Sequence, residues 1–294
     1  MIKRVLFVAA ASSVLVACSL ILDADRNQCK TIADCAARGT DWSTASCVAN
    51  VCVFGTSDSG PEADASDPSD PLRCADEERL ARDPNRRVKL TQFYHDVVAE
   101  VPLSDATIRL CGRLDPECNA PRLTVSPDPS TGEISLDVEF GFDGFVEVQG
   151  PLLFPTLFQT EPPSYADKTE YRSGITTDIL DFLARRAYPA GPDPELGHIH
   201  WNVEDCDAVR QEGINVFASS SAGEKTRQIY LYSWNPRTDV DQTDTDGRGF
   251  LLNVPPGNTT LTAVYRGTGK TLGKATVAVR KGFITSVLIT PATR

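Results

Sequence analysis

Apolar and polar residues alternate through much of the chain from about Leu72 onward. The clearest case is Gly132–Phe140, GEISLDVEF, in which apolar residues at every second position are separated by acidic or polar ones. A period of two is typical of a β-strand with one buried face and one solvated face. The strand GFVEV follows an Asp143-Gly144 turn signal, which predicts a hairpin. Further segments of the same kind come at intervals suited to an antiparallel β-sandwich, namely GINVFA, QIYLYSW, GFLLNV, TLTAVY, ATVAV and ITSVLI.

One segment, Thr176–Tyr188, has helical spacing instead. In TTDILDFLARRAY, the residues Ile179, Phe182 and Leu183 fall on one helical face, a threonine can cap the N-terminal end, and two arginines suit the C-terminal end. The segment predicts one short amphipathic helix that joins two sandwiches. The stretch QFYHDVV around His95 is expected to be helix or loop.

The order of strands is repeated. The first copy reads ATIRLCGRLD, STGEISLDVEFG and GFVEV, and the second reads EGINVFASSS, DTDGRGFLLNVPPG and TLTAV. In each copy a short strand and a loop precede a turn glycine, an alternating strand and a closing glycine, which are Gly132 and Gly141 in one copy and Gly247 and Gly257 in the other. The repeat predicts two β-sandwiches, each large enough to bury a core of its own.

The N-terminus has the features of an export signal. Lys3 and Arg4 precede a largely apolar run that ends in Leu15-Val16-Ala17-Cys18, and this run is too short to cross a bilayer. LVAC resembles the lipobox of bacterial lipoproteins. The resemblance implies that residues 1-17 are a signal peptide and that Cys18 carries the lipid. Ser19 stands where many such lipoproteins carry the aspartate that retains them in the inner membrane, so the outer membrane is expected, on its periplasmic or cell-surface face. The alternative is an ordinary signal peptide with an incidental cysteine.

Export places the remaining eight cysteines in an oxidising compartment, where disulfides are expected rather than metal thiolates. Four of them cluster without a CxxC pair and predict two disulfides in a small knob, with three pairings open: Cys29, Cys35, Cys47 and Cys52. Cys111 and Cys118 flank GRLDPE and are expected to close a short loop. Cys74 and Cys206 are left over, so elimination pairs them with each other.

Charge and composition predict how the remaining segments of the chain are organised. The net charge of −11 has the wrong sign for nucleic-acid binding. GTSDSGPEADASDPSDP is acidic and rich in proline, which predicts a disordered spacer. The expected order is therefore a signal peptide (1-17), a lipidated cysteine-rich knob (18-54), an acidic linker (55-71), a first sandwich (72-160), a connector with the helix (161-196) and a second sandwich (197-294).

The segment TDTDGRGFLLNVPPGNTTLTAVYRGTGKTLGKATVAVRKGFITSVLI resembles the carboxypeptidase-regulatory-like family. The resemblance covers Ile199–Thr293 well and Val88–Val148 more loosely. It implies an all-β chain of two antiparallel sandwiches of the transthyretin (prealbumin) or immunoglobulin-like type, which serve as accessory modules. No zinc-peptidase segment accompanies them, so the resemblance implies no peptidase activity.

Gly269-Lys270-Thr271 ends the run GTGKT, which invites a nucleotide-binding interpretation. A phosphate-binding loop needs G-x-x-x-x-G-K-S/T before a helix, but the leading position here is Val264 and an alternating strand follows. We expect a hairpin turn and no nucleotide.

Two weak candidate sites lie on predicted strands. His198, His200 and Glu204 share parity in HIHWNVE and could hold zinc or copper, unless the residues between them form the core and the histidines only face solvent. In DVDQTDTDG neither register fits the ligand spacing of an EF-hand, so only a looser calcium site is open there.

Tyr230, Tyr232 and Trp234 alternate and could line one face as a glycan platform. Either these rings or the intervening Ile229 and Leu231 must form the core.

These patterns predict a non-enzymatic outer-membrane lipoprotein that acts as a binding or structural module of the cell envelope. No GxSxG sequence supports nucleophilic catalysis. The alternatives are a carbohydrate-binding surface lipoprotein and a metal-dependent activity at the His198/His200 strand. Expected partners are the membrane, through the lipid anchor, and an envelope protein or glycan, with no cofactor, nucleotide or nucleic acid.

Overall fold

The computed structural model describes residues 31, 33–34, 45–48, 51–54, 70–74, 80–160, 163–219 and 223–291. The chain divides into two compact units, residues 1–62 and 63–294. In the first unit, strands β1 (Ala45–Val48) and β2 (Val51–Phe54) pair antiparallel with Cys47 opposite Cys52. The predictions for Cys18, Cys29, Cys35 and nearly all of the acidic linker lie outside the described residues.

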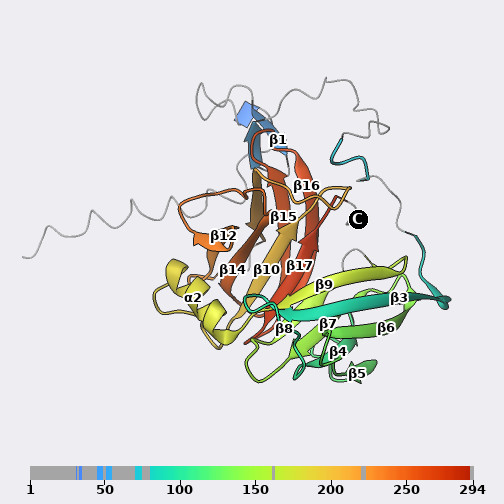
Figure 1. The fold of residues 1–294 in the computed structure, drawn as a ribbon. Helices are drawn as coiled ribbons and strands as arrows, with labels where there is room; N and C mark the ends of the chain where they lie inside the picture. The colour runs from blue at the N-terminus through green and yellow to red at the C-terminus, as the bar shows by residue number, and fades with distance from the viewer. Residues whose placement is uncertain are drawn as a thin grey trace, which may run out of the picture. The chain divides into compact units, whose positions relative to one another are not determined.

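The second unit is built on one large sheet and two small ones (Figure 1). The nine strands of the large sheet are, in spatial order, β13 (Asn235–Arg237), β12 (Arg227–Tyr232), β14 (Arg248–Val254), β10 (Gly197–Val203), β17 (Ile284–Ile289), β8 (Thr156–Gln159), β7 (Gly144–Gln149), β4 (Thr107–Gly112) and β5 (Leu123–Val125). The small sheets are β6 (Glu133–Phe140), β3 (Asp83–Asp96) and β9 (Lys168–Gly174), and β11 (Ile214–Ala218), β15 (Gly257–Tyr265) and β16 (Thr271–Val279).

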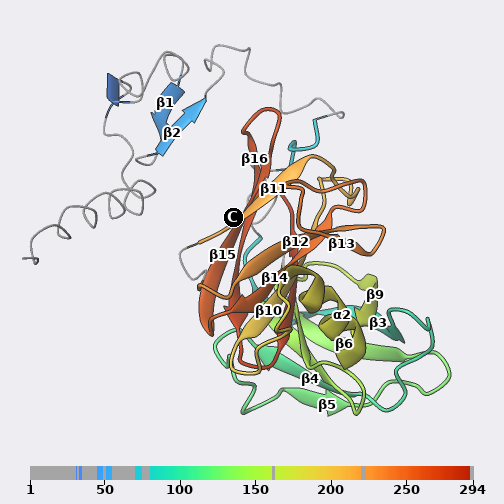
Figure 2. The same cartoon turned by 90° about the vertical axis from the view of Figure 1, so that its left-hand side faces the viewer.

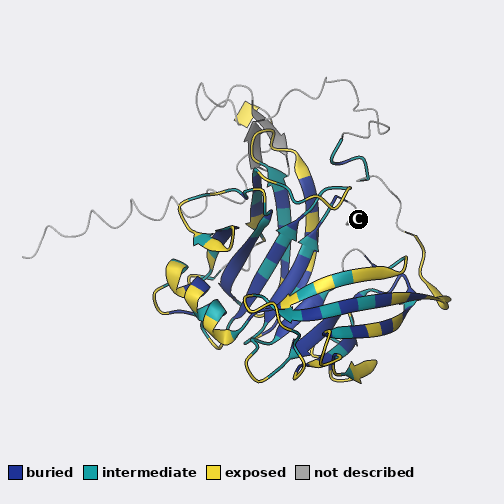
Figure 3. Ribbon diagram, in the orientation of Figure 1, coloured by how far each residue is buried: buried dark blue, intermediate teal, exposed yellow. Residues whose placement is uncertain are grey.

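Each small sheet packs on one part of the large sheet, and the two sandwiches have separate cores (Figure 3). In the first sandwich, β3 to β9, Leu90 and Leu136 pack with Ile108 and Val146 of the large sheet. In the second sandwich, β10 to β17, the core holds Trp201 at its centre. These cores bury the apolar members of the alternating strands, so the prediction of an all-β chain with two sandwiches is confirmed.

The two sandwiches share the large sheet through β17. This strand pairs parallel with β10 of its own sandwich and also parallel with β8 of the first one, where Ile284 lies opposite Thr156. β3 and β9 are also parallel, whereas the sequence analysis expected antiparallel pairing throughout. Parallel neighbours need long crossover connections, and such connections leave no local turn signal.

The helix, α2 (Thr177–Ala187), covers the face of the large sheet that lies opposite the second core (Figure 2). The Thr176 side chain accepts a hydrogen bond from the Ile179 N–H (3.5 Å), as expected of an N-cap. The buried residues are Leu180, Leu183 and Ala184, while Phe182, which was expected on the buried face, is 51% exposed. The apolar residues at i, i+3 and i+4 from Leu180 define the packing stripe, and Phe182 falls outside it.

The repeat corresponds to a repeated pairing scheme. In the first copy β4 pairs with β7, in the second β11 pairs with β15, and the alternating strand of each copy lies in the opposite sheet. The four repeat glycines, Gly132, Gly141, Gly247 and Gly257, all have positive φ (71°, 77°, 59° and 131°), a region that residues with a Cβ rarely adopt.

Two segments differ from their sequence interpretation. His95 belongs to β3, because pairing with Ser173 of β9 keeps this stretch extended. β9 itself lies in the expected connector, 161-196, which therefore supplies a strand to the first sandwich as well as the helix.

The run GTGKT connects the antiparallel strands β15 and β16 as a turn, as expected, with Gly269 at φ 70°.

Two disulfides link described parts of the second unit. The long-range disulfide joins Cys74 to Cys206, 132 residues apart, and the short-loop disulfide joins Cys111 to Cys118, seven residues apart. Across the described residues, no helix combines the length and the apolar character needed to span a membrane.

Candidate functional site

A pocket of about 290 Å³, which we call the junction pocket, lies where the two sandwiches meet. Residues of β8, β17 and β10 from the shared sheet line it, together with β9 of the first sandwich and Trp234 of the second. Alternation along β10 explains why polar side chains reach it. Trp201 and its neighbours at odd positions enter the second core, so His200 and Asn202 project from the other face.

Positive charge is concentrated in the junction pocket. Its lining holds four cationic side chains and two carboxylates, so its formal charge is 4 − 2 = +2, with histidine neutral. The whole chain carries −11. Lined in this way, the pocket is a local positive site on an acidic protein. The charged residues are Lys168, Glu170, Arg172, Glu204, Arg210 and Arg248.

Glu170 is held ionised between the cations of β9. Its carboxylate contacts Arg172 and the Nζ of Lys168 (2.6 Å), and it accepts a hydrogen bond from Nε2 of Gln92 (2.9 Å). Burial raises the pKa of Glu170, but the two cations and the hydrogen bonds outweigh burial and lower the pKa to about 2. Arg172 is not saturated by this contact, because its buried Nε has no hydrogen-bond partner.

Glu204 pairs with Arg210 on the other side of the pocket. The Nε of Arg210 lies 2.9 Å from a Glu204 oxygen, and Arg210 also donates to the side-chain oxygen of Asn202. Burial raises the pKa of Glu204 above its usual value, even though cations of both sandwiches face it. Arg248 has only a distant carboxylate partner, with 3.8 Å between its Nη2 and an Asp246 oxygen.

His200 lies among these charges as a neutral ring. Its Nδ1 is 3.1 Å from the Oγ of Ser286, and its buried Nε2 has no hydrogen-bond partner. Burial, helped by the nearby Arg210 and Arg248, lowers the pKa of His200 to about 3. A ring with so low a pKa is a weak base near neutral pH, and no carboxylate orients its second nitrogen. The Ser286–His200 pair therefore lacks the features of an activated nucleophile.

Two aromatic residues border the pocket and have exposed rings. Trp234 is 36% exposed and stacks near His200, with the guanidinium of Arg248 4.6 Å from its ring centroid. Tyr171 alternates with Glu170 and Arg172 on β9, so its ring, 76% exposed, lies on the opposite face of the strand and stacks on Phe93 at 5.1 Å between ring centroids.

The backbone that presents Trp234 is strained. β12 and β13 are joined by a two-residue turn, Ser233-Trp234, whose φ angles are 49° and 64°. Two positive φ values identify a type I′ turn, which favours Asn-Gly rather than Ser-Trp. Left-handed residues other than glycine cost of order 1 kcal/mol or more each and cluster at ligand-binding sites. The turn thus holds a large ring at the pocket at the expense of backbone stability.

The structure does not bring the three predicted metal ligands together. His198 is fully buried, with its ring 5.5 Å from that of Phe154 and its Nδ1 accepting a hydrogen bond from the Asn253 N–H (3.2 Å). His200 and Glu204 line the junction pocket. Within the described ranges, no group of three or more histidine, cysteine, aspartate or glutamate side chains could hold a metal ion. The three residues share a face, but α2 and its neighbours cover only the part of that face near His198.

The predicted glycan platform is also divided. Tyr230 is 2% exposed and packs on Trp201 at 5.3 Å between ring centroids, and the hydroxyl of Tyr232 donates to the carbonyl of Gln242. Only Trp234 of this trio reaches the junction pocket. The three rings therefore form no exposed platform, because the end of β12 is covered by the second core.

The cations of the pocket were not predicted as site residues from the sequence. Lys168, Glu170 and Arg172 alternate in KTEYRSG and so share one face of β9, a signal that was available but lay in the expected connector. Arg210 and Arg248 come from separate loop and strand positions, and no sequence spacing joins them to β9.

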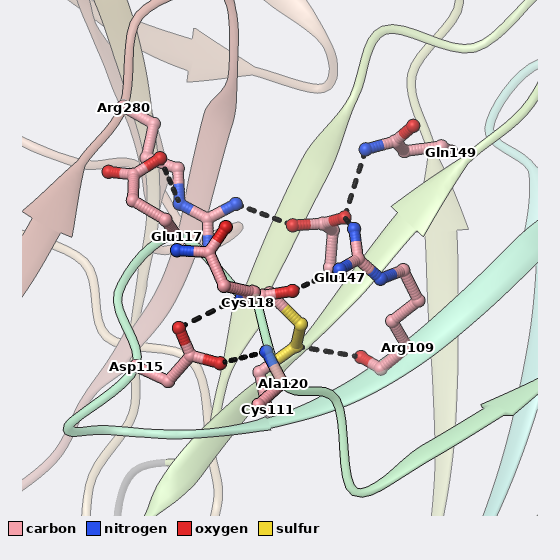
Figure 4. Close-up of a disulfide and its surroundings, with 10 residues drawn as sticks. Arg109, Cys111, Asp115, Glu117, Cys118, Ala120, Glu147, Gln149 and Arg280 are labelled. Carbon is pink, nitrogen blue, oxygen red and sulfur yellow. Dashed lines mark hydrogen bonds and ion pairs between the residues drawn. A yellow bond between two sulfur atoms is a disulfide. The ribbon is translucent and has the colours of Figure 1, made fainter.

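A buried ion network fastens the two sandwiches beside the short-loop disulfide (Figure 4). Glu147 of β7 is 1% exposed, and its two oxygens bind Nη1 of Arg109 (2.7 Å) and Nη1 of Arg280 (2.5 Å). Arg280 directly follows β16 of the second sandwich, where its guanidinium lies between the rings of Phe145 and Phe283. The network helps to fix the relative position of the two sandwiches, and with it the shape of the junction pocket.

No protein-family model matches the chain, and no curated protein is similar to it. Among solved structures, the Bacillus anthracis TIE protein has 10% identity and a TM-score of 0.23, with 69% of this chain and 34% of that chain covered. The Streptococcal ancillary pilin has 14% identity, a TM-score of 0.22 and coverage of 69% and 68%. The shaft pilin SpaA of Lactobacillus rhamnosus GG has 12% identity, a TM-score of 0.21 and coverage of 69% and 97%.

The chain spans about a third of the length of the Bacillus anthracis protein. At TM-scores this low, these likenesses carry no conclusion about what the present chain does.

Proposed function

We propose that this protein is a non-enzymatic, lipid-anchored binding module of the cell envelope, held in the outer membrane through Cys18. The observation that carries the binding role is the junction pocket, which has a formal charge of +2 in a chain of −11. A pocket that gathers positive charge on an acidic protein is suited to a small anionic ligand.

Binding is favoured over catalysis by the state of the polar groups in the pocket. His200 has a pKa of about 3 and contacts Ser286, so it is a poor general base. The other polar side chains of the pocket are charged groups, Asn202 and the hydroxyls of Thr156, Ser173 and Tyr171, which can position and hold a ligand.

The N-terminal part of the chain is assigned a spacing role. In this proposal residues 1-17 are removed, and residues 18-54 form a knob that is cross-linked through Cys29, Cys35, Cys47 and Cys52. Residues 55-71 act as an acidic spacer, whose charge and prolines keep it extended so that the sandwiches stand away from the bilayer.

Two measurements test the proposal. Mass spectrometry of the protein extracted from membranes is expected to find residues 1-17 missing and a lipid on Cys18, and Cys18→Ser should abolish that modification. Calorimetric titration of the detergent-solubilised protein with small carboxylates and phosphate is expected to show saturable binding that Lys168→Gln weakens. An unprocessed N-terminus contradicts the anchor, and no uptake of any anion contradicts the binding role.

A further inference from the structure

We infer that the junction pocket binds an acidic sugar, a hexuronate ring whose carboxylate meets the arginines and whose apolar face lies on Trp234. This inference rests on the proposed function and names the ligand class of the same pocket. It depends on four features of the pocket: unused arginine donors, size, aromatic rings and neutral polar groups.

The arginines of the pocket have donors left over. The buried Nε of Arg172 has no acceptor, and Arg248 makes only a long bond from its Nε to the carbonyl oxygen of Asp246 (3.5 Å), with a carboxylate oxygen of that residue 3.8 Å from its Nη2. The unpaired buried donor of Arg172 is costly, and a ligand carboxylate would supply acceptors to both guanidinium groups. Glu170 accepts from Nη2 of Arg172 and from Lys168, and Glu204 pairs with Arg210, so neither carboxylate reaches the Nε of Arg172.

The size of the pocket selects a small ligand. A volume of about 290 Å³ is just below the range of about 300–1,000 Å³ that is usual for ligand sites. One monosaccharide ring with a carboxylate is of that scale, whereas a nucleotide or an extended peptide is larger.

The indole of Trp234 distinguishes a sugar from a small inorganic anion or a short carboxylate as the ligand. Such an anion would use the cations and leave the exposed part of this indole, which contacts Arg248 and His200, without a ligand contact. The C–H face of a pyranose is apolar and packs on an aromatic face, while its hydroxyls remain available for hydrogen bonds. The strained Ser233-Trp234 turn, which holds the indole at the pocket, is explained if the indole contacts the ligand.

Neutral polar groups are present for the sugar hydroxyls. His200, Asn202 and Ser286 line the same pocket, and the Nε2 of His200 is buried without a partner. A neutral imidazole, an amide and a hydroxyl can each donate or accept, as hydroxyl recognition requires. The pocket therefore offers cations for the carboxylate, a ring for the apolar face and neutral groups for the hydroxyls.

The test is calorimetric titration of the detergent-solubilised mature protein with glucuronate and galacturonate. Glucose, galactose, acetate and inorganic phosphate are titrated in parallel. One of the two uronates is expected to bind at least about 10-fold more tightly than its neutral sugar and than acetate, since loss of a charge-assisted contact is worth about that factor or more.

Variants locate the binding. Arg248→Gln and Trp234→Leu should each weaken uronate binding about 10-fold or more. The matched controls, Arg227→Gln and Phe217→Leu, remove an exposed arginine and an exposed ring away from the junction pocket and should change nothing. If Arg248→Gln fails to fold, Lys168→Gln, at a more exposed side chain, takes its place with the same expected direction.

The outcomes separate the inference from the proposed function. If acetate or phosphate binds as tightly as the uronates and Trp234→Leu has no effect, the acidic-sugar inference is overturned while an anion-binding function stands. If the uronates bind but neither Trp234→Leu nor the cation variant weakens them, the pocket assignment is overturned. If no anion binds at all, the proposed function fails as well.

Discussion

Replacing Arg280 with methionine tests how strongly the buried ion network holds the two sandwiches together. Glu147 is 1% exposed and is neutralised by Arg109 and Arg280, which reach it from different sandwiches. Arg280→Met removes one of these cations and keeps an apolar side chain between Phe145 and Phe283. The variant therefore leaves the carboxylate buried with one cation, Arg109, and the amide of Gln149 as its partners, while most of the packing is retained.

The expected loss follows from the cost of an incompletely paired buried charge. Breaking a buried ion pair by removal of one partner costs about 3–5 kcal/mol. Because Arg109 still binds Glu147, we expect a value near the lower end, about 3 kcal/mol in the free energy of unfolding. For a folded unit of this size, that loss lowers the melting temperature by about 6–12 °C.

Urea unfolding followed by circular dichroism measures this loss. Arg266→Met is the matched control, because its ion pair with Asp241 is exposed and should contribute at most about 1 kcal/mol. In the double variant Arg280→Met/Glu147→Gln, the loss should be smaller than the sum of the two single losses, since neither partner remains as a buried charge. If Arg280→Met loses no more than the control, the network is not what joins the sandwiches.

Three further predictions concern cross-links and protonation. Replacing Cys206 and its partner with serine opens a loop of separation 132, and replacing Cys118 and its partner opens one of separation 7, so chain entropy predicts losses of about 5 and about 2.5 kcal/mol in the free energy of unfolding. Equal losses in urea would contradict this ranking. Burial lowers the pKa of His198 to about 4 and that of His200 to about 3. Below pH 6.5 the unfolded chain therefore binds protons that the folded chain does not bind until the pH falls further. These two histidines should together remove about 5 kcal/mol of stability between pH 6.5 and pH 4.5, and His198→Gln should remove roughly half of that pH dependence. An unchanged pH dependence in the variant would show that His198 titrates normally in the folded state. Burial raises the pKa of Glu204, so protonation on moving from pH 7.5 to 5.5 removes a negative charge that faces the cations of β9 and Arg210. Uronate should bind more tightly at the lower pH, and Glu204→Gln should bind equally at both; tighter binding at pH 7.5 would refute the assignment.

The local pattern of apolar and polar residues was sufficient to predict individual strands, the helix and the turns. The alternation in Gly132–Phe140 predicted β6, which spans Glu133–Phe140, and the capped amphipathic segment predicted α2 within one residue at each end. The spacing of glycines predicted turns that do have positive φ. Each of these features depends on residues close together in the chain, where steric preference and periodicity act directly.

Strand pairing and the burial of individual side chains depend on long-range contacts, which the sequence pattern did not predict. The parallel pairing of β17 with β8 joins strands that are far apart in the chain, and neither strand carries a mark of its partner. His198 and His200 share a face, but packing elements bury the first and leave the second at a pocket. A period of two identifies the face of a side chain and does not identify what covers that face.

The most direct test of this account is a crystal structure of the mature protein with the tighter-binding uronate. The sugar is expected in the junction pocket, with its carboxylate within hydrogen-bonding distance of Arg172 and Arg248 and its ring parallel to the indole of Trp234. A uronate bound elsewhere on the protein, with the junction pocket unchanged, would contradict it.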